Sequence, residues 1–207
     1  MPVVQDRLEL RRRLTRIAAQ QSGYFTTAQA LEAGYSYSAQ RYHVHRGNWE
    51  QVDRALFRLP DWPVGLQDEY VRWFLWSGRR AVVSHDTALA VHGLSDVSPA
   101  RIHLTVPLDF RMRGQGVVLH RGDLPVGDVW EQGGYRITTP LRSVLDVAAA
   151  GVLELDQVAS AIGDGERAGR FTRRMLFARA DELGPQAALR IERAAQWLDE
   201  RSRPAIE

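Results

Sequence analysis

The stretch from Gly23 to Pro60, GYFTTAQALEAGYSYSAQRYHVHRGNWEQVDRALFRLP, contains the pattern that decides the fold of the N-terminal part of the chain. A short segment around Ala30 is followed by Gly34, and a second segment then ends at Gly47. Small residues with a glycine at the turn allow two helices to cross closely, which a helix-turn-helix requires. The stretch therefore predicts a helix-turn-helix, with the run before Gly23 as a bracing helix.

Polar caps set the limits of the first two helices. Leucine and isoleucine recur at helical spacing over 6–21, and Asp6 is the expected N-cap of that helix. Thr26 or Thr27 is expected to cap the second helix, which runs through Glu32. Its small apolar face is predicted to comprise Ala28, Ala30 and Leu31.

The third helix presents two different faces. Ser36 or Ser38 is its expected cap, and Gly47 stops it. At 3.6 residues per turn, one side carries Ala39, His43 and Val44. The opposite side carries polar groups suited to base edges in a major groove: Ser38, Arg41, Tyr42 and His45. Tyr42 is also compatible with packing under the wing.

A two-stranded wing is predicted after this helix, with strands at Trp49–Val52 and Leu56–Leu59. Arg54 and Arg58 are expected to project from it toward phosphate groups, as is Arg46 at the helix end. The predicted DNA-binding residues are Thr27, Ser36, Ser38, Arg41, Tyr42, His45, Arg46, Arg54 and Arg58. The alternative is a winged helix used for protein contacts, because fold alone does not fix function.

The charge distribution agrees with DNA as the partner. The chain has a net charge of +2. Residues 1–60 contain nine arginines against five acids, a net charge of +4, whereas residues 61–207 contain 18 arginines against 20 acids, a net charge of −2. The basic excess therefore accompanies the helix-turn-helix, where phosphates would be bound.

Composition excludes several kinds of site. All 27 basic residues are arginine, so no lysine is present for a phosphate loop, a Schiff base or a nuclease centre. The absence of cysteine excludes disulfides and thiolate metal sites. No apolar run approaches a membrane span, and the start, MPVVQDRLELRRRL, lacks a signal-peptide core, so we expect a cytoplasmic protein.

The remainder of the chain is predicted to be a second, α/β domain. The Pro- and Gly-rich run 60–65 marks a boundary, giving domains at 1–60 and 67–207. Helices are expected at 67–77, 84–93, 139–150, 153–162, 172–182 and 185–200. Strands are expected at 101–106, 116–120 and 134–138, and 81–83 is expected to be a short buried segment. The fold class is thus α/β (α+β), an N-terminal winged helix-turn-helix followed by a small mixed sheet packed against helices.

Catalysis is not expected from this second domain. His85 and His92 lie two helical turns apart, about 10 Å, which is too far to share a metal. His103 and His120 are the other histidines to consider. The glycine-rich link 163–169 lacks the lysine and context of a phosphate loop, although Asp164 and Glu166 within it could bind a cation. We therefore predict no enzyme activity, no cofactor and no metal.

The segments GYFTTAQALEAG and SAQRYHVHRGNWEQVDRALFRL resemble the N-terminal domain of AbiEi-family antitoxins from type IV toxin–antitoxin systems, first known in phage abortive infection. Weaker echoes of that family occur in AVVSHDTALAVHGL and RITTPLRSVLDVAA. The family usually has glycine in the wing where this chain has Ala55. If the position requires a positive φ, alanine would be strained there.

The resemblance implies a DNA-binding antitoxin that represses its own operon through promoter inverted repeats. Its partner would be a nucleotidyltransferase-like toxin, countered by the C-terminal domain, either by direct contact or by opposing the toxin's effect. Self-association in solution or only on DNA is compatible with this function. The alternative is a winged-helix transcription regulator or protein-interaction module without antitoxin activity.

Overall fold

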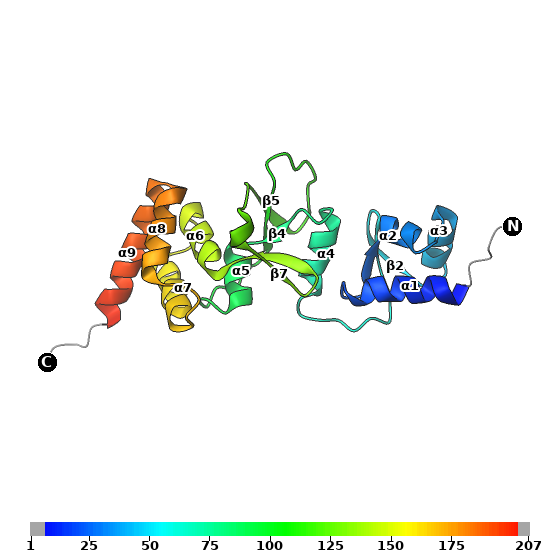
Figure 1. Ribbon diagram of the computed structural model, residues 1–207. Helices are drawn as coiled ribbons and strands as arrows, with labels where there is room; N and C mark the ends of the chain where they lie inside the picture. Colours follow the sequence, from blue (N-terminus) through cyan, green and yellow to red (C-terminus); the bar gives the residue numbers. More distant parts are fainter. Residues whose placement is uncertain (1–6, 203–207) are drawn as a thin grey trace. The chain divides into compact units, whose positions relative to one another are not determined.

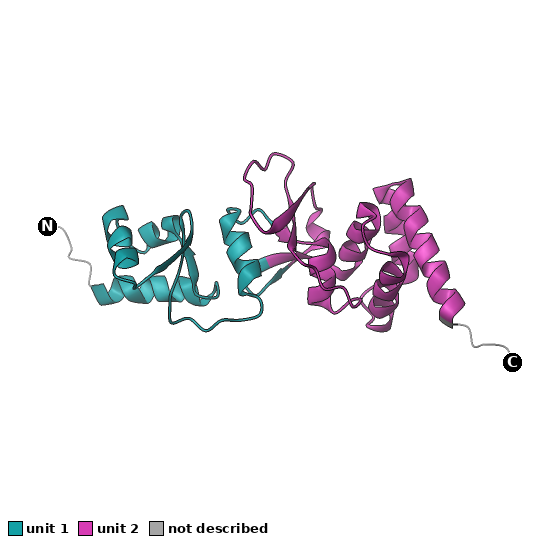
Figure 2. Cartoon of the chain, turned by 180° about the vertical axis from the view of Figure 1, so that it is seen from behind, with its two compact units in different colours: residues 1–81, 131–135 teal, residues 82–130, 136–207 magenta. Residues whose placement is uncertain are grey.

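The computed structural model describes residues 7–202, which form two compact units (Figure 2). Unit 1 comprises residues 1–81 together with 131–135, and unit 2 comprises residues 82–130 and 136–207. Asp6, the expected cap of the first helix, lies outside the described residues. The division into domains at 1–60 and 67–207 stays a prediction.

Unit 1 begins with a winged helix-turn-helix, as the sequence predicts (Figure 1). Its helices are α1 (Arg7–Ala19), α2 (Thr27–Glu32) and α3 (Tyr37–His45). Its strands are β1 (Tyr24–Thr26), β2 (Glu50–Asp53) and β3 (Leu56–Arg58). The strand order is β1-β3-β2, so the predicted two-stranded wing is in fact part of a three-stranded antiparallel sheet. The additional strand, β1, pairs Phe25 with Phe57.

The core of this fold is aromatic. Phe25 is fully buried, and its ring lies 4.8 Å from that of Trp49 and 5.6 Å from that of Phe57. Leu14 and Ala18 of α1 pack against the same cluster. Helix α2 contributes less than predicted: Ala30 is buried, but Ala28 and Leu31 are exposed. A six-residue helix has only one turn and a half, so a single small residue can face the core.

Helix α4 (Asp68–Trp76) completes the helices of unit 1 and contacts β1. Val71, Trp73 and Leu75 are its buried apolar residues. Asp68 in its first turn is buried as well, because its carboxylate accepts a hydrogen bond from Arg58 at 2.9 Å.

The second sheet is mixed, with the strand order β6-β5-β4-β8-β7. Its strands are β4 (Val82–Val83), β5 (Ile102–Val106), β6 (Val117–Arg121), β7 (Val129–Gln132) and β8 (Tyr135–Thr138). β4 pairs antiparallel with β5 and parallel with β8, while β5 and β6 are parallel over five residue pairs. The sequence predicts β5, β6 and β8 as strands, gives the segment of β4 only as a short buried one, and misses β7, in which two of four residues are exposed.

Helices of unit 2 gather around a large apolar core that includes Leu145, Ile162 and Ile191. They are α5 (His85–His92), α6 (Pro140–Ala150), α7 (Leu155–Arg167), α8 (Arg173–Leu183) and α9 (Pro185–Ser202), with the last four visible together in Figure 1. Thr139 caps α6 with Pro140 at its first position, as predicted. None of the helices among residues 7–202 is long and apolar enough to cross a bilayer.

The glycine-rich link predicted at 163–169 is wrong over most of its length, because α7 continues through it to Arg167. Gly163 and Gly165 are buried helical residues. A Cβ atom on Gly165 would lie 2.3 Å from the ring of Phe171, so close packing and not flexibility requires glycine there.

Candidate nucleic-acid interface

A capping box fixes the start of α2. The Thr26 hydroxyl accepts a hydrogen bond from the Gln29 amide at 3.3 Å, and Gln29 Oε1 accepts one from the Thr26 amide at 2.9 Å. The Gln29 side chain also exchanges hydrogen bonds with Gln21 at 2.9 and 3.2 Å. Thr26 is therefore the cap, and Thr27 is the first, half-buried residue of α2.

Helix α3 is held at its angle by a glutamine. The Ser36 hydroxyl caps α3 by accepting from the Ala39 amide at 3.2 Å. Gln40, only 3 % exposed, donates through Nε2 to the carbonyl oxygens of Tyr35 at 3.1 Å and Thr27 at 3.4 Å. Gln40 thus links α3 to the start of α2 and to the turn between the two helices. Sequence reasoning missed it, although a glutamine beside the inward-facing Ala39 was a usable signal.

The outward face of α3 is polar and accessible. The predicted residues Ser38, Arg41, Tyr42 and His45 are all exposed. Tyr42 is 55 % exposed, so it does not pack beneath the wing. The guanidinium of Arg46 lies 5.8 Å from the centre of the Tyr42 ring. Hydrogen-bonding groups and an arginine fork on one exposed helix face are what base-edge recognition in a major groove requires.

The inward face of α3 is anchored by His43. Its ring stacks on that of Trp49 with centroids 4.8 Å apart, and its Nδ1 lies 3.2 Å from the Asn48 amide nitrogen. Burial lowers the pKa of His43 below its usual value, so the imidazole is neutral near pH 7. His43 therefore adds no positive charge to the inward face of α3.

The wing turn contains a residue in an unfavourable conformation. Ala55 has a φ of 62°, in the left-handed region that favours glycine. Its carbonyl oxygen accepts a hydrogen bond from the Thr27 amide at 3.0 Å. Arg54 beside it is exposed, and its backbone amide donates to the Asp53 carboxylate. The turn thus holds Arg54 in solvent close to the start of α2.

Arg58, predicted to contact phosphate, is placed differently. It is 9 % exposed, and its Nη2 donates to Asp68 Oδ2 at 2.9 Å and to the Pro63 carbonyl oxygen at 3.1 Å. Its guanidinium also lies 5.3 Å from the centre of the Tyr24 ring. Because a carboxylate inside unit 1 already neutralises this charge, Arg58 is removed from the proposed interface.

The remaining arginines of the candidate surface keep their charge available. Within residues 7–202, no acidic side chain lies within ion-pairing distance of Arg41, Arg46 or Arg54. By contrast, Arg13 on α1 is paired with Glu9 at 3.1 Å. Unpaired arginines around an exposed polar helix form a surface able to bind an anionic polymer.

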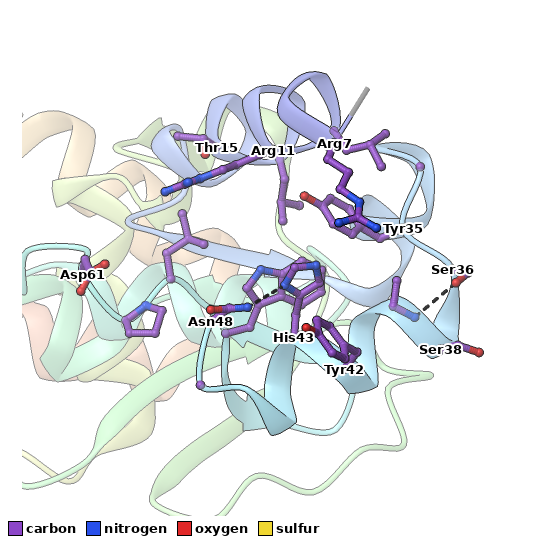
Figure 3. Close-up of a pocket in the computed structure, with 18 of the residues that line it drawn as sticks. Arg7, Arg11, Thr15, Tyr35, Ser36, Ser38, Tyr42, His43, Asn48 and Asp61 are labelled. Carbon is purple, nitrogen blue, oxygen red and sulfur yellow. Dashed lines mark hydrogen bonds between the residues drawn. The ribbon is translucent and has the colours of Figure 1, made fainter. Parts of the chain in front are cut away.

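A groove borders this surface on the α1 side (Figure 3). Ser36, Ser38 and Tyr42 of the candidate interface line it, opposite Arg7 and Arg11 of α1. Its volume is about 1030 Å³.

A second polar cluster lies in unit 2, where three histidines from α5, β5 and β6 meet. The rings of His85 and His120 are stacked with centroids 3.5 Å apart, and His120 Nε2 lies 3.2 Å from His103 Nδ1. His103 Nε2 is 4.0 Å from the Asp86 carboxylate. His92 is separate, since its Nε2 lies 2.7 Å from the Thr138 carbonyl oxygen. Sequence spacing could not show this meeting, because it depends on the pairing of β5 with β6.

Burial governs the chemistry of this cluster. Desolvation and the neighbouring imidazoles lower the pKa of His85 to about 3, and desolvation also lowers the pKa of His103 and His120. His85 has a φ of 52°, which is unfavourable for a side chain of this size. Among residues 7–202, no group of three or more histidine and acidic side chains has the arrangement of a metal site.

Asp164 and Glu166, which the sequence suggests as a cation site, bind groups of the chain itself. Asp164 accepts hydrogen bonds from the Ser95 amide and from Arg167, and Glu166 is paired with Arg173 at 2.9 Å. These carboxylates therefore stabilise the surroundings of α7 through partners within the chain.

Comparison with known proteins finds a family that is similar to this chain over the winged helix-turn-helix. Residues 12–60 match the family described as "Transcriptional regulator, AbiEi antitoxin". The match confirms the AbiEi resemblance over the region that contains α2, α3 and the wing. No protein of curated function matches the chain.

A solved structure supports the fold over most of the chain. The crystal structure of the RV2827C protein from Mycobacterium tuberculosis is similar with a TM-score of 0.59. The similarity covers 95% of this chain and 78% of that chain, at 16% sequence identity. At this identity the comparison concerns the fold alone, and it extends through the α/β part that follows the AbiEi match.

Proposed function

We propose that this protein is a DNA-binding antitoxin of a type IV toxin–antitoxin system that represses its own operon. The proposal rests on two findings that concern the same segment of the chain. Residues 12–60 match AbiEi antitoxin regulators, and within that match α3 presents an exposed polar face flanked by unpaired arginines.

In this proposal α3 enters the major groove. Its side chains Ser38, Arg41, Tyr42 and His45 would face base edges. Arg41 is the strongest candidate for sequence reading, because its fork can bind guanine O6 and N7 together. The phosphate contacts would come from Thr27, Ser36, Arg46 and Arg54. These four residues at the start of α2, at the two ends of α3 and in the wing would then fix orientation, and the outward face of α3 would supply specificity.

Two copies are expected to occupy the halves of an inverted repeat in the promoter. Half-sites read by paired helix-turn-helix units lie about 34–36 Å apart, one turn of the duplex. Association of the copies in solution or only on DNA is equally compatible with this arrangement. A promoter-bound repressor of this kind would act in the cytoplasm, and the proposal assigns no catalytic reaction, cofactor or metal to the chain.

The antitoxic activity is proposed for the C-terminal α/β part, acting against a nucleotidyltransferase-like toxin. The support is the AbiEi family match in the preceding segment. A second function is favoured by the extent of that match, which ends at residue 60. The same winged helix could serve a transcription regulator or protein-interaction module without antitoxin activity.

Gel-shift titration of the full chain on its own upstream DNA tests the repressor. We expect saturable binding to a fragment that contains an inverted repeat. Affinity should fall steeply as the salt concentration rises from about 50 to about 200 mM. Affinity equal to that for an unrelated duplex of the same length would refute sequence-specific repression.

Co-expression with the product of an adjacent nucleotidyltransferase gene tests the antitoxin. The full chain and its Arg41→Ala variant should both relieve growth arrest, because the substitution affects α3 alone. If neither relieves it while the chain still binds its promoter, the plain regulator is the correct function.

A further inference from the structure

The groove beside α3 has the size and lining of a small-molecule site. Pockets that hold small ligands have volumes of roughly 300–1,000 Å³, with mostly apolar walls and a few polar groups. The groove, at about 1030 Å³, is at the top of that range. Leu10 and Leu14 of α1 form part of its wall, and Leu59 and Pro60 form another part. All of its lining residues belong to unit 1.

Aromatic rings dominate the side of the groove formed by α3 and the segment after it. The Tyr35 ring lies 5.0 Å from that of Trp49 and 5.3 Å from that of His43. Tyr42 lies 5.6 Å from His43 and is itself 55 % exposed. Tyr35 and Trp49 are only 8 % and 4 % exposed and support this side of the groove from beneath, so Tyr42 is the ring on which a planar ligand can stack.

The opposite side of the groove is positively charged. Arg7 and Arg11 are exposed residues one helical turn apart on α1, and both line the groove (Figure 3). Asp61 is the single acidic residue in the lining. Two guanidinium groups at this spacing can together donate several hydrogen bonds to one phosphate. The charge of the groove therefore favours an anion.

We propose that this groove binds a planar aromatic anion of the nucleotide class, with its phosphate between Arg7 and Arg11 and its base against the aromatic side. Apolar rings on one side and paired arginines on the other match the two chemically different halves of such a ligand. This site shares Ser36, Ser38 and Tyr42 with the proposed DNA interface, but binding to it can be measured without DNA and does not depend on the antitoxin function.

Occupation of the groove has a consequence that rests on the proposed function. Ser36, Ser38 and Tyr42 line the groove and also belong to the proposed DNA interface. A ligand stacked on Tyr42 would block that side chain and add negative charge beside α3. The nucleotide should therefore weaken promoter binding.

Isothermal titration calorimetry of the full chain tests the site without DNA. The probes are adenosine 5′-monophosphate, guanosine 5′-monophosphate, adenosine and inorganic phosphate. At least one nucleotide should bind ten times or more tightly than adenosine or phosphate alone. Equal affinity for adenosine and its monophosphate, or no binding of either nucleotide, overturns the proposal.

Paired variants on α1 locate the binding. The Arg7→Gln/Arg11→Gln variant should lose at least tenfold in nucleotide affinity. The matched control is Arg12→Gln/Arg16→Gln, which removes the same charge from exposed residues of α1 that do not line the groove. Its affinity should stay within twofold of the original. Equal losses in the two variants would show nonspecific charge attraction and overturn the assignment.

Competition is measured separately by fluorescence anisotropy of labelled promoter DNA. Saturating nucleotide should weaken DNA binding at least fivefold in the original chain and less than twofold in Arg7→Gln/Arg11→Gln. If the chain binds no promoter DNA, the proposed repressor fails while the calorimetry still decides the groove. Unchanged DNA affinity at saturation refutes the competition.

Discussion

In unit 1, Arg41, Arg46 and Arg54 project from α3 and the wing into solvent, whereas in unit 2 arginines converge on buried carboxylates. Asp128 is 3 % exposed and lies 2.9 Å from Arg142 and 2.8 Å from Arg179. In a chain without lysine, the same cation therefore has two roles. Its neighbours, and not its abundance, determine whether it is available to a partner or contributes to the fold.

The largest expected effect comes from removing an internal arginine. Arg142 also pairs with Asp146 at 2.7 Å, so Arg142→Met leaves two buried carboxylates without this cation. We expect a loss of about 3–5 kcal/mol in the free energy of unfolding, measured by urea denaturation at pH 7. Arg174→Met removes an exposed arginine of α8 and should change stability by less than about 0.5 kcal/mol. Equal effects would show that the Asp128 network does not stabilise unit 2.

The pH dependence of this loss is a further check. Burial raises the pKa of Asp146 to about 6 in spite of Arg142. Without Arg142 this carboxyl should take up a proton more readily, which removes its buried charge. The difference between the variant and the original chain should therefore shrink as the pH falls toward 6, and it should level off below about pH 6, where Asp146 is protonated in both chains.

Removing an outward arginine should affect DNA and leave the fold unchanged. Arg41→Ala is expected to weaken promoter binding by about 1–3 kcal/mol, with relaxed preference at one base pair, because the bidentate contact is lost. Its urea midpoint should equal that of the original chain. Anisotropy titrations on duplexes mutated one position at a time give the readout.

The control for Arg41 is Arg12→Ala, an exposed arginine of α1 outside the proposed interface. A loss for Arg41→Ala that is uniform across all duplexes would identify a phosphate contact instead. A loss of stability would show that the exposed face of α3 contributes to the core.

Sequence reasoning succeeded where the signals are local. Ser36, Thr139 and Gly93 mark helix ends through hydrogen bonds or conformations that depend on nearby residues, and they were read correctly. The polar face of α3 followed from helical period alone. These features account for the winged helix and for most helices of unit 2.

It failed where contacts join distant segments. β1 is only three residues long and exists because it pairs with β3. The paired residues are about 30 positions apart in the sequence, so this contact is non-local. The burial of Arg58 in β3 depends on Asp68 in α4. Gly163 and Gly165 suggested a loop, yet both lie in α7, and the ring of Phe171 approaches Gly165 too closely for a larger residue.

The histidines extend the comparison of the two units. His45 is exposed on α3, whereas His85 is buried against His120 in unit 2. Because the pKa of His85 is lowered to about 3 in the folded state, its contribution to stability is complete above pH 6.5. That contribution falls as the pH drops from 6.5 toward 3, by up to about 1.4 kcal/mol per pH unit.

His85→Asn should reduce this slope between pH 6.5 and 5, measured by urea denaturation across the range. Asparagine is suited to the φ of 52° and does not titrate. An unaltered slope in His85→Asn would assign the acid sensitivity to other groups.

The smallest expected effect concerns the wing turn. Ala55 has a φ of 62°, where a Cβ costs about 1–2 kcal/mol, while glycine loses about 0.5–1 kcal/mol more chain entropy on folding. Ala55→Gly should therefore stabilise the protein by roughly 0.5–1 kcal/mol in urea denaturation. Ala178→Gly makes the same chemical change at an exposed position inside α8 and should instead cost about 1 kcal/mol. Opposite signs would show that the wing of unit 1 holds a strained backbone that α8 lacks; a loss in both variants would mean that the Thr27–Ala55 hydrogen bond and its surroundings compensate the strain fully.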